Sequence, residues 1–189
     1  MNKKYKEIYG NYWPKASQKI SDLIIKYAGI KDQICEVGAA SGHIMAYLTL
    51  RGYQITGYEI RQKVCLDTNE KFETHGINTR IINDDIMNID TKYDVLYTTG
   101  LLQCLDEKAR IQMIEKFSKL SPVVIVVVPE IIKNRNDYSG IEVGVSGCCE
   151  YQTDSLGKEL NCFFKNIIYG FWSAKELELA DNFLWFVCH

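Results

Sequence analysis

The 189-residue sequence has no long apolar run. Its longest, Val123–Val128, is far shorter than the roughly 20 residues that a membrane-spanning helix needs. The first residues, Met1–Lys6, are polar and basic with no apolar stretch behind them, so nothing there resembles a secretory signal. We therefore expect a cytoplasmic protein with no membrane partner.

Blocks of basic residues are also missing. Lys and Arg number 22 against 24 Asp and Glu, which gives a formal net charge of -2. A nucleic-acid binder usually concentrates positive charge to neutralise phosphates. The composition therefore disfavours nucleic acid as the partner.

Paired C-x-x-C motifs, which zinc sites often use, are absent as well. The seven cysteines are an odd number and are scattered, apart from the adjacent Cys148 and Cys149. We expect reduced thiols that fill space in the core, and no bound metal.

Strands and helices alternate along the chain. Strands are expected at 33–37, 54–58, 79–82, 93–98, 123–128 and 183–187, and helices at 15–28, 42–51, 61–74, 106–120 and 172–181. Helices between successive strands imply right-handed crossovers. The pattern predicts one α/β domain over 1–189, with a doubly wound, mostly parallel sheet and helices on both of its faces.

A glycine turn follows the first of these strands. Gly38 and Gly42 permit backbone angles that a side chain disfavours and a close approach of the backbone to a ligand. The next helix would direct its free amide groups at the same crevice. Glu59 ends the following strand about 20 residues later, where a carboxylate can accept hydrogen bonds from ribose hydroxyls. This arrangement is typical of a nucleoside-binding half-fold.

The spacing of the glycines separates two cofactor classes. A dinucleotide turn, G-x-G-x-x-G, needs glycines where this chain has Ala40 and His43. Instead, Glu36 stands two residues before Gly38, and Gly42 stands four after it. The segment resembles motif I of the class I S-adenosylmethionine-dependent methyltransferases, an acid, any residue, then G-x-G-x-G, with Ala40 in place of the middle glycine.

The resemblance implies a Rossmann-like methyltransferase fold with S-adenosylmethionine as cofactor and S-adenosylhomocysteine as product. Glu36 would reach the amino group of the methionine part, and Glu59 would hold the ribose. After the third strand, Asp85 and Ile86, or Asp84 as the alternative, would meet the adenine. An Asx turn is the competing explanation for these acids.

The segment Tyr93–Gln103 resembles motif IV of the same family, whose backbone lies along the methyl donor. Resemblance extends from Ile34 to Glu130. The full set of residues expected at the cofactor is Tyr12, Glu36, Gly38, Ala39, Ala40, Gly42, Glu59, Ile60, Asp84, Asp85, Ile86, Thr99, Gly100 and Leu101.

Motif IV departs from many relatives, which carry Glu-His or His-His where this chain has Gln103 and Cys104. Gln103 can orient a substrate but cannot abstract a proton. Cys104 could act as a thiolate only if its pKa were lowered, and a buried cysteine on a helix is usually inert. Glu130, at the end of the fifth strand, is the carboxylate first expected to contact the acceptor. Glu130 and Gln103 are therefore the candidate catalytic residues.

The substrate side divides into three segments around the core at 31–130. Residues 1–30 hold an aromatic segment and a helix and form a possible lid, with ordinary packing as the alternative. Residues 131–170 are expected to be a substrate-side insertion. Residues 171–189 form a terminal helix, capped by Ser173, and a last strand.

Class I methyltransferases normally add a seventh, antiparallel strand between strands five and six. In this sequence, no candidate for that strand follows the expected sixth strand at 183–187. Either the region Leu160–Ile168 replaces it or the sheet lacks it, and a sheet edge left unpaired would favour a homodimer over a monomer.

The function expected is metal-independent methyl transfer to an O, N or S atom of a small molecule. The sulfonium methyl is already activated, so the protein mainly has to align the reactants and exclude water. Only a hydroxyl acceptor needs a strong base. The alternatives are a non-catalytic S-adenosylmethionine-binding protein and an NAD(P)-dependent oxidoreductase. The oxidoreductase is less favoured because this chain lacks the third glycine of the dinucleotide turn.

Overall fold

The computed structural model describes residues 3–10, 14–130, 153–179 and 182–189. Tyr12 and much of the expected insertion, 131–152, lie outside these ranges. The helices are α1 (Lys3–Tyr9), α2 (Pro14–Tyr27), α3 (His43–Thr49), α4 (Gln62–Thr74), α5 (Glu107–Leu120), α6 (Thr153–Asn161) and α7 (Ala174–Leu177), with short 3-10 turns η1 (Ile86–Asn88) and η2 (Leu102–Cys104). No helix in the described ranges is long and apolar enough to cross a membrane.

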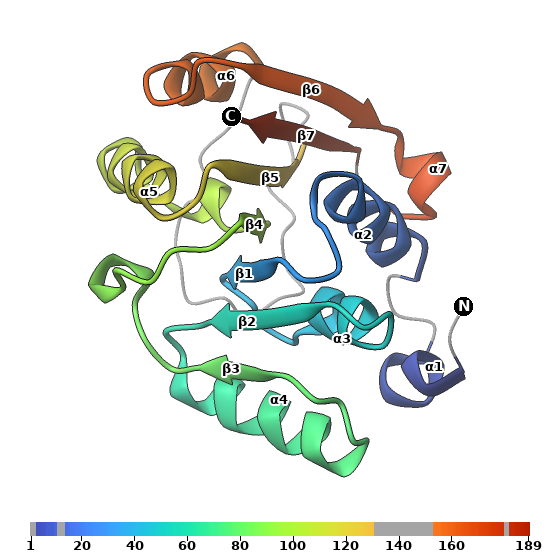
Figure 1. Cartoon of the computed structure of the whole chain (residues 1–189). Helices are drawn as coiled ribbons and strands as arrows, with labels where there is room; N and C mark the ends of the chain where they lie inside the picture. The colour runs from blue at the N-terminus through green and yellow to red at the C-terminus, as the bar shows by residue number, and fades with distance from the viewer. Residues whose placement is uncertain (1–2, 11–13, 131–152, 180–181) are drawn as a thin grey trace.

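A seven-stranded sheet runs through the middle of the molecule (Figure 1). Its strands are β1 (Gln33–Val37), β2 (Gln54–Tyr58), β3 (Arg80–Ile82), β4 (Val95–Thr99), β5 (Val123–Pro129), β6 (Ile167–Trp172) and β7 (Phe183–Cys188), in the order β3-β2-β1-β4-β5-β7-β6. The first five strands pair in parallel, and β7 is antiparallel to both of its neighbours. The expected doubly wound sheet is confirmed, and its order reverses between β1 and β4, where ligands bind in such folds.

The end of the sheet differs from the expectation. The strand at 183–187 is β7, the antiparallel strand inserted between β5 and β6, and the true sixth strand is β6, which the sequence pattern missed. The expected replacement, Leu160–Ile168, reaches β6 only at its last residues. The sheet therefore lacks no strand. The pattern of β6 is unclear because Ile168, Tyr169 and Phe171 are all about half exposed or more.

The terminal helix is shorter than expected. Instead of 172–181, α7 spans Ala174–Leu177, because Glu178 adopts a left-handed conformation (φ 55°) that ends it. Ser173 is confirmed as its N-cap, since its hydroxyl accepts a hydrogen bond from the Glu176 amide at 3.2 Å.

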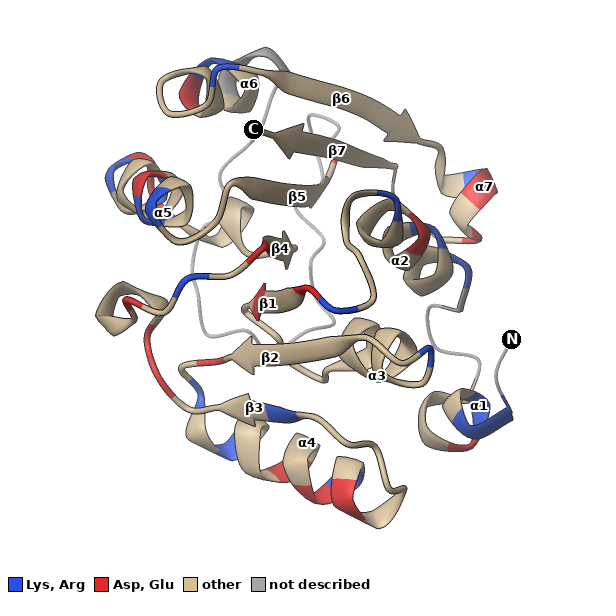
Figure 2. Cartoon of the chain, viewed as in Figure 1, with Lys and Arg blue, Asp and Glu red and all other residues tan. Residues whose placement is uncertain are grey.

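Helices cover both faces of the sheet (Figure 1). One apolar cluster joins α2, α3, α4 and α7 to one face, and the other joins α5 and α6 to the opposite face. Figure 2 shows the charged residues on helices and loops, with few on the central strands. Residues Val124–Val128 of β5 are fully buried, as expected for a strand covered on both faces.

The N-terminal helix α1 packs beside α3. Tyr5 is fully buried, donates a hydrogen bond to the Ser17 hydroxyl at 2.9 Å and meets the Tyr47 ring edge-on. Tyr9 donates to the Ser41 carbonyl at 2.8 Å. Tyr5 therefore belongs to ordinary packing, whereas Tyr9 reaches the glycine turn.

Gly57 of β2 generates a prediction about stability. A Cβ there would lie 2.5 Å from the Met45 sulfur and 2.9 Å from the Ala39 Cβ. Gly57→Ala should lower the free energy of unfolding by about 1–3 kcal/mol through overpacking. In α6, a Cβ on Gly157 would meet only ordinary contact, at 3.9 Å. Gly157→Ala should be neutral or stabilise by up to about 1 kcal/mol. Urea unfolding of both variants checks this, and equal effects would contradict it.

Candidate functional site

Left-handed backbone shapes the turn between β1 and α3. Gly38, Ala40 and Gly42 have φ values of 74°, 44° and 64°. The amides of Gly38 and Ala39 both donate to the Tyr58 carbonyl, at 2.9 and 3.1 Å. The turn is thereby tied to the carboxyl end of β2.

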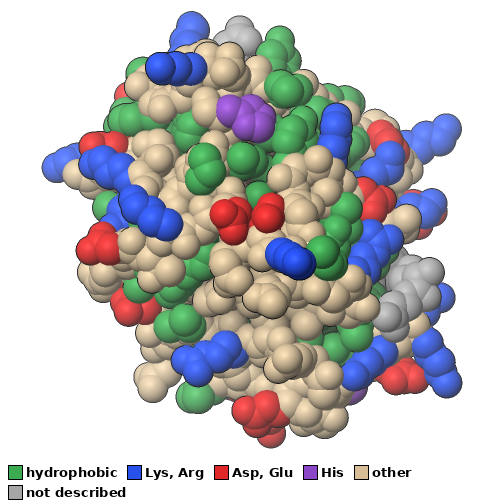
Figure 3. Space-filling view, viewed as in Figure 1, with side chains coloured by type: hydrophobic (Ala, Val, Ile, Leu, Met, Phe, Trp, Pro, Cys, Tyr) green, Lys and Arg blue, Asp and Glu red, His purple; other side chains and the backbone are tan. Residues whose placement is uncertain are grey.

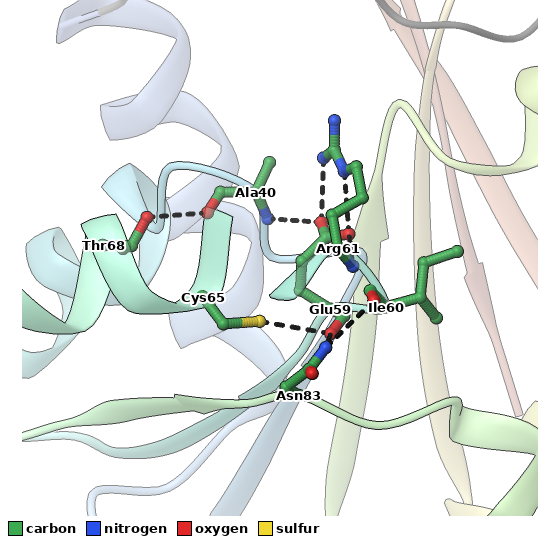
Figure 4. Close-up of polar contacts among 7 residues, drawn as sticks. All are labelled: Ala40, Glu59, Ile60, Arg61, Cys65, Thr68 and Asn83. Atoms are coloured by element: carbon green, nitrogen blue, oxygen red, sulfur yellow. Dashed lines mark hydrogen bonds and ion pairs between the residues drawn. The ribbon is translucent and has the colours of Figure 1, made fainter. Parts of the chain in front are cut away.

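Ala40 is unusual because it carries a side chain in the left-handed region, a strain of about 1 kcal/mol or more. Contacts on both sides hold it (Figure 4). Its amide donates to Glu59 Oε2 at 3.1 Å, and its carbonyl accepts from the Thr68 hydroxyl at 3.1 Å. The substitution of the middle glycine is therefore compensated by bonds to β2 and α4.

Gly42 and Gly38 are glycines for different reasons. A Cβ on Gly42 would lie 2.5 Å from the Phe72 ring, so this glycine makes room for α4. Packing against Phe72 therefore adds to the left-handed backbone that the sequence predicted for Gly42. A Cβ on Gly38 would lie 3.4 Å from Leu101 in the loop after β4. Gly38 thus lies opposite the motif IV segment.

Glu36 is buried beneath this turn, with 2% of its surface exposed. The Tyr97 hydroxyl donates to its Oε2 at 2.8 Å. Burial raises the pKa of Glu36 to about 8, the Tyr97 hydrogen bond opposes the rise, and the Glu59 charge adds to it. Tyr97 was missed from the sequence, although the β1–β4 register places it directly opposite Glu36.

Glu59, just after β2, is also buried, but its surroundings favour the ionised carboxylate. Burial raises its pKa, but hydrogen bonds and the charge of Arg61 outweigh that effect, so the pKa is lowered overall. Arg61 contacts both carboxylate oxygens through its side chain, each at 2.9 Å (Figure 4). Nothing in the sequence pattern signalled Arg61.

The acids after β3 form local turns. Asp84 Oδ1 accepts from the Asp85 amide at 2.7 Å, and Asp85 Oδ1 accepts from the Met87 amide at 2.9 Å. Asp85 therefore forms an Asx turn with the amide two residues on, whereas Asp84 bonds the amide of the next residue, and each uses Oδ1 for these bonds. The Ile86 side chain is buried in the core, so only its backbone could meet a ligand. Ile60 is 69% exposed on the neighbouring segment.

Thr99 is the last residue of β4, and the loop that follows is held by the Gly100 amide, which donates to the Val127 carbonyl at 2.9 Å. Gly100 has a φ of 69°. Gln103 is 91% buried, and its Oε1 has no hydrogen-bond partner among the described residues. A buried amide oxygen without a partner is unfavourable, so Gln103 is a position where a ligand donor could be accommodated.

Glu130 lies at the carboxyl end of β5, at the same edge of the sheet as these loops. Its Oε2 accepts from the Asn182 side chain at 2.8 Å, and its amide donates to the Asn182 carbonyl at 2.8 Å. Asn182 in turn accepts from the Ala174 amide at 2.7 Å. Glu130 is thus oriented from the start of β7, a link that the sequence did not suggest.

The two internal histidines are not poised as bases. His43 is buried beside Ser41, and burial, followed by the charge of Lys71, lowers its pKa to about 4, so the ring is neutral at pH 7. His75 ends α4, and its Nδ1 lies 2.9 Å from the Lys71 carbonyl. In the described part of the chain, no three His, Cys, Asp or Glu side chains converge to hold a metal ion.

The structure therefore brings several of the expected residues together. Glu36, Gly38, Ala40, Glu59 and Leu101 surround one turn at the switch point. Ile60, Asp84, Asp85, Gly100 and Gln103 follow strands β2, β3 and β4 at the same edge.

Residues 34–121 match the family profile described as "Methyltransferase domain". A curated relative, an rRNA adenine N-6-methyltransferase of Lysinibacillus sphaericus, is 42% identical over 57 residues. This stretch covers 30% of the present chain and 23% of the relative. The chain thus matches about a quarter of that relative's length.

Solved structures match over nearly the whole chain. Magnesium protoporphyrin IX methyltransferase from Synechocystis PCC 6803, crystallised with S-adenosylhomocysteine, is 15% identical to this chain with a TM-score of 0.73. The match covers 98% of this chain and 93% of that protein's chain. The PH0226 protein from Pyrococcus horikoshii is 13% identical with a TM-score of 0.73, covering 100% and 96%. At such identities the likeness shows the fold.

The raised pKa of Glu36 predicts how stability depends on pH. Folding raises the pKa of Glu36, so its carboxyl contributes to stability at pH values below the pKa that it has in the unfolded chain. This contribution is lost as the pH rises through about 8, the pKa in the folded protein. Between about pH 5 and 8, the unfolding free energy of the wild type should fall relative to Glu36→Gln, by at most roughly 1.4 kcal/mol per pH unit.

Thermal or urea unfolding across this range measures the difference. Glu130→Gln removes a carboxyl from the same edge of the sheet and controls for the substitution itself. Parallel profiles for the wild type and Glu36→Gln would show that Glu36 is already ionised in the folded state.

Proposed function

We propose that this chain, which contains a methyltransferase domain and has the class I S-adenosylmethionine-dependent methyltransferase fold, transfers the cofactor's methyl group to an O, N or S atom of a small molecule. The observation that carries the proposal is the turn at the switch point. It presents left-handed backbone at Gly38, flanked by the buried carboxyls of Glu36 and Glu59. An amino acid joined to a nucleoside needs such a pair of anchors.

Each anchor fits one end of the cofactor. Glu36 would bind the ammonium of the methionine part, and the arriving positive charge would favour release of its proton. Glu59 would accept from the ribose hydroxyls. Asp84 or Asp85 would accept from the adenine amine through Oδ2, with the exposed Ile60 against the ring. The backbone of Thr99–Leu101 would lie along the sulfonium.

The chemistry asks little of side chains. Methyl transfer requires the acceptor atom, the methyl carbon and the sulfur to be aligned with water excluded. Gln103 offers a buried amide oxygen that could orient an amine or hydroxyl, and Glu130 offers a carboxylate fixed by Asn182. Because His43 is buried and its lowered pKa makes it a weak base, the arrangement favours an acceptor that needs no strong base.

The N-terminal segment would close the site from above. Tyr9 contacts the Ser41 carbonyl within the turn, and its ring meets His43 edge-on. Lys71 of α4 lies 5.2 Å from the centre of the Tyr9 ring. Helix α1 therefore contacts the turn, α3 and α4, and we propose that the segment 1–30, including Tyr12, covers bound cofactor.

A small-molecule acceptor is favoured over RNA by charge. The net charge is -2, and Figure 3 shows Lys and Arg scattered among Asp and Glu on the face drawn. An RNA substrate would be favoured by a concentrated basic surface. RNA remains the competing acceptor class because the short curated match is named an rRNA methyltransferase.

Cofactor binding at the turn is tested by Gly38→Val. The valine would be strained at a φ of 74° and would stand where the backbone approaches the ligand. Calorimetric titration should detect S-adenosylhomocysteine binding to the wild type and to Gly157→Ala, with at least about a hundredfold loss, roughly 2.7 kcal/mol, in Gly38→Val. Circular dichroism establishes that the variant is folded. Unchanged affinity would place the cofactor elsewhere.

The acceptor class is tested with S-adenosylmethionine radiolabelled in its methyl group. Label should pass to small amines, thiols or phenols from a metabolite extract, and not to total RNA. Gly38→Val is the inactive control. Labelled RNA would overturn the small-molecule acceptor, whereas cofactor binding without transfer to either pool would indicate a non-catalytic binding protein.

A further inference from the structure

The ribose anchor Glu59 is already occupied in this structure. Arg61, the residue before α4, folds its side chain back so that Nε donates to Oε1 and Nη2 donates to Oε2, both at 2.9 Å (Figure 4). The Arg61 amide donates to Oε1 at 3.0 Å, and the Ala40 amide donates to Oε2 at 3.1 Å.

Counting acceptor positions shows what this means. A carboxylate offers about four, two on each oxygen. All four on Glu59 are used, and its side chain is only 4% exposed, so no open side remains for further donors. Two of the four donors are backbone amides of fixed segments. The other two belong to the Arg61 side chain, which is 47% exposed and can move.

We propose that Arg61 competes with the cofactor ribose for Glu59 and must release the carboxylate for the cofactor to bind, so that Arg61 sets an upper limit on cofactor affinity. This inference rests on the proposed function, in which Glu59 accepts the two ribose hydroxyls. It assigns to Arg61 a role in determining affinity that is separate from the anchors themselves.

The electrostatics support an exchange of this kind. Arg61 and Glu59 shift each other's pKa in the directions expected of a strong pair, since hydrogen bonding to Glu59 raises the pKa of the guanidinium. Ribose hydroxyls are neutral donors, and bonds from them are weaker than those from a guanidinium fork. Arg61 is 47% exposed and can enter solvent when released, but the buried Glu59 carboxylate then loses its counter-ion. The exchange at Glu59 alone is therefore unfavourable, and the rest of the cofactor must drive it.

The first test compares Arg61→Met with Lys63→Met. Methionine keeps a long stem but no donor. Lys63 pairs with Asp67 at 2.7 Å on the exposed surface, so its substitution removes the same charge two residues away. In calorimetric titrations at pH 7.5, Arg61→Met should bind S-adenosylhomocysteine about 5- to 30-fold tighter than the wild type. In the variant, the cofactor no longer has to break the two Arg61 side-chain bonds to Glu59, whose loss is partly compensated by water in the wild type. Lys63→Met should match the wild type.

Arg61→Lys provides a second variant, which keeps the charge but cannot form two parallel hydrogen bonds to the carboxylate. Its affinity for S-adenosylhomocysteine should lie between those of the wild type and Arg61→Met. Salt gives an independent readout. Raising NaCl should tighten binding to the wild type, because screening weakens the Arg61–Glu59 pair, and this dependence should vanish in Arg61→Met.

Nucleosides locate the effect. The gain in Arg61→Met should be seen with adenosine and be absent with 2′,3′-dideoxyadenosine, which lacks the competing hydroxyls. Equal gains with both, or affinity of Arg61→Met equal to or below the wild type, would overturn the competition while leaving the proposed function intact. Absence of S-adenosylhomocysteine binding by the wild type and all the folded variants would overturn both.

Discussion

The carboxylate of Glu59 is the contact on which the site depends. It accepts the Ala40 amide and so helps to hold a side-chain-bearing residue in left-handed backbone. It also accepts from the first residues leading into α4, which anchors that helix beside the turn. A buried carboxylate is stable only when its acceptor positions are satisfied, and here donors from two segments satisfy it. The same group that builds the turn is the one that a nucleoside would use.

The carboxyls of Glu36, on β1, and Glu59, just after the neighbouring strand β2, are held in opposite protonation states. Glu36 has one hydroxyl donor and deep burial, so its proton is retained to about pH 8. Glu59 faces a guanidinium and two amides, so its pKa is lowered. This difference in protonation is favourable, because a neutral Glu36 avoids repulsion with the Glu59 charge until a cation binds beside it. Glu36 and the Glu59–Arg61 pair together therefore carry little net charge.

The residues proposed to face the acceptor are held differently from those proposed to hold the cofactor. Gln103 is buried with an amide oxygen that lacks a partner in the described part of the chain, and Glu130 is fixed through Asn182 at the start of β7. The Gln103 amide cannot abstract a proton. Solved structures at 13 to 15% identity show the fold alone, so any specificity for an acceptor has to be inferred from this chain's own residues.

The sequence by itself determined the β1–turn–α3–β2 unit, its leading acid Glu36 and the acid Glu59, because glycine spacing and strand periodicity are local properties. The parallel core and the edge where the site lies followed from the alternation of strands and helices. Tertiary structure alone decided that β7 inserts before β6, that Phe72 requires Gly42, that Tyr97 reaches Glu36 and that Arg61 turns back onto Glu59. The first three depend on strand register and on contacts between distant segments, and the last on a side-chain orientation in three dimensions. No local pattern of residues encodes any of them.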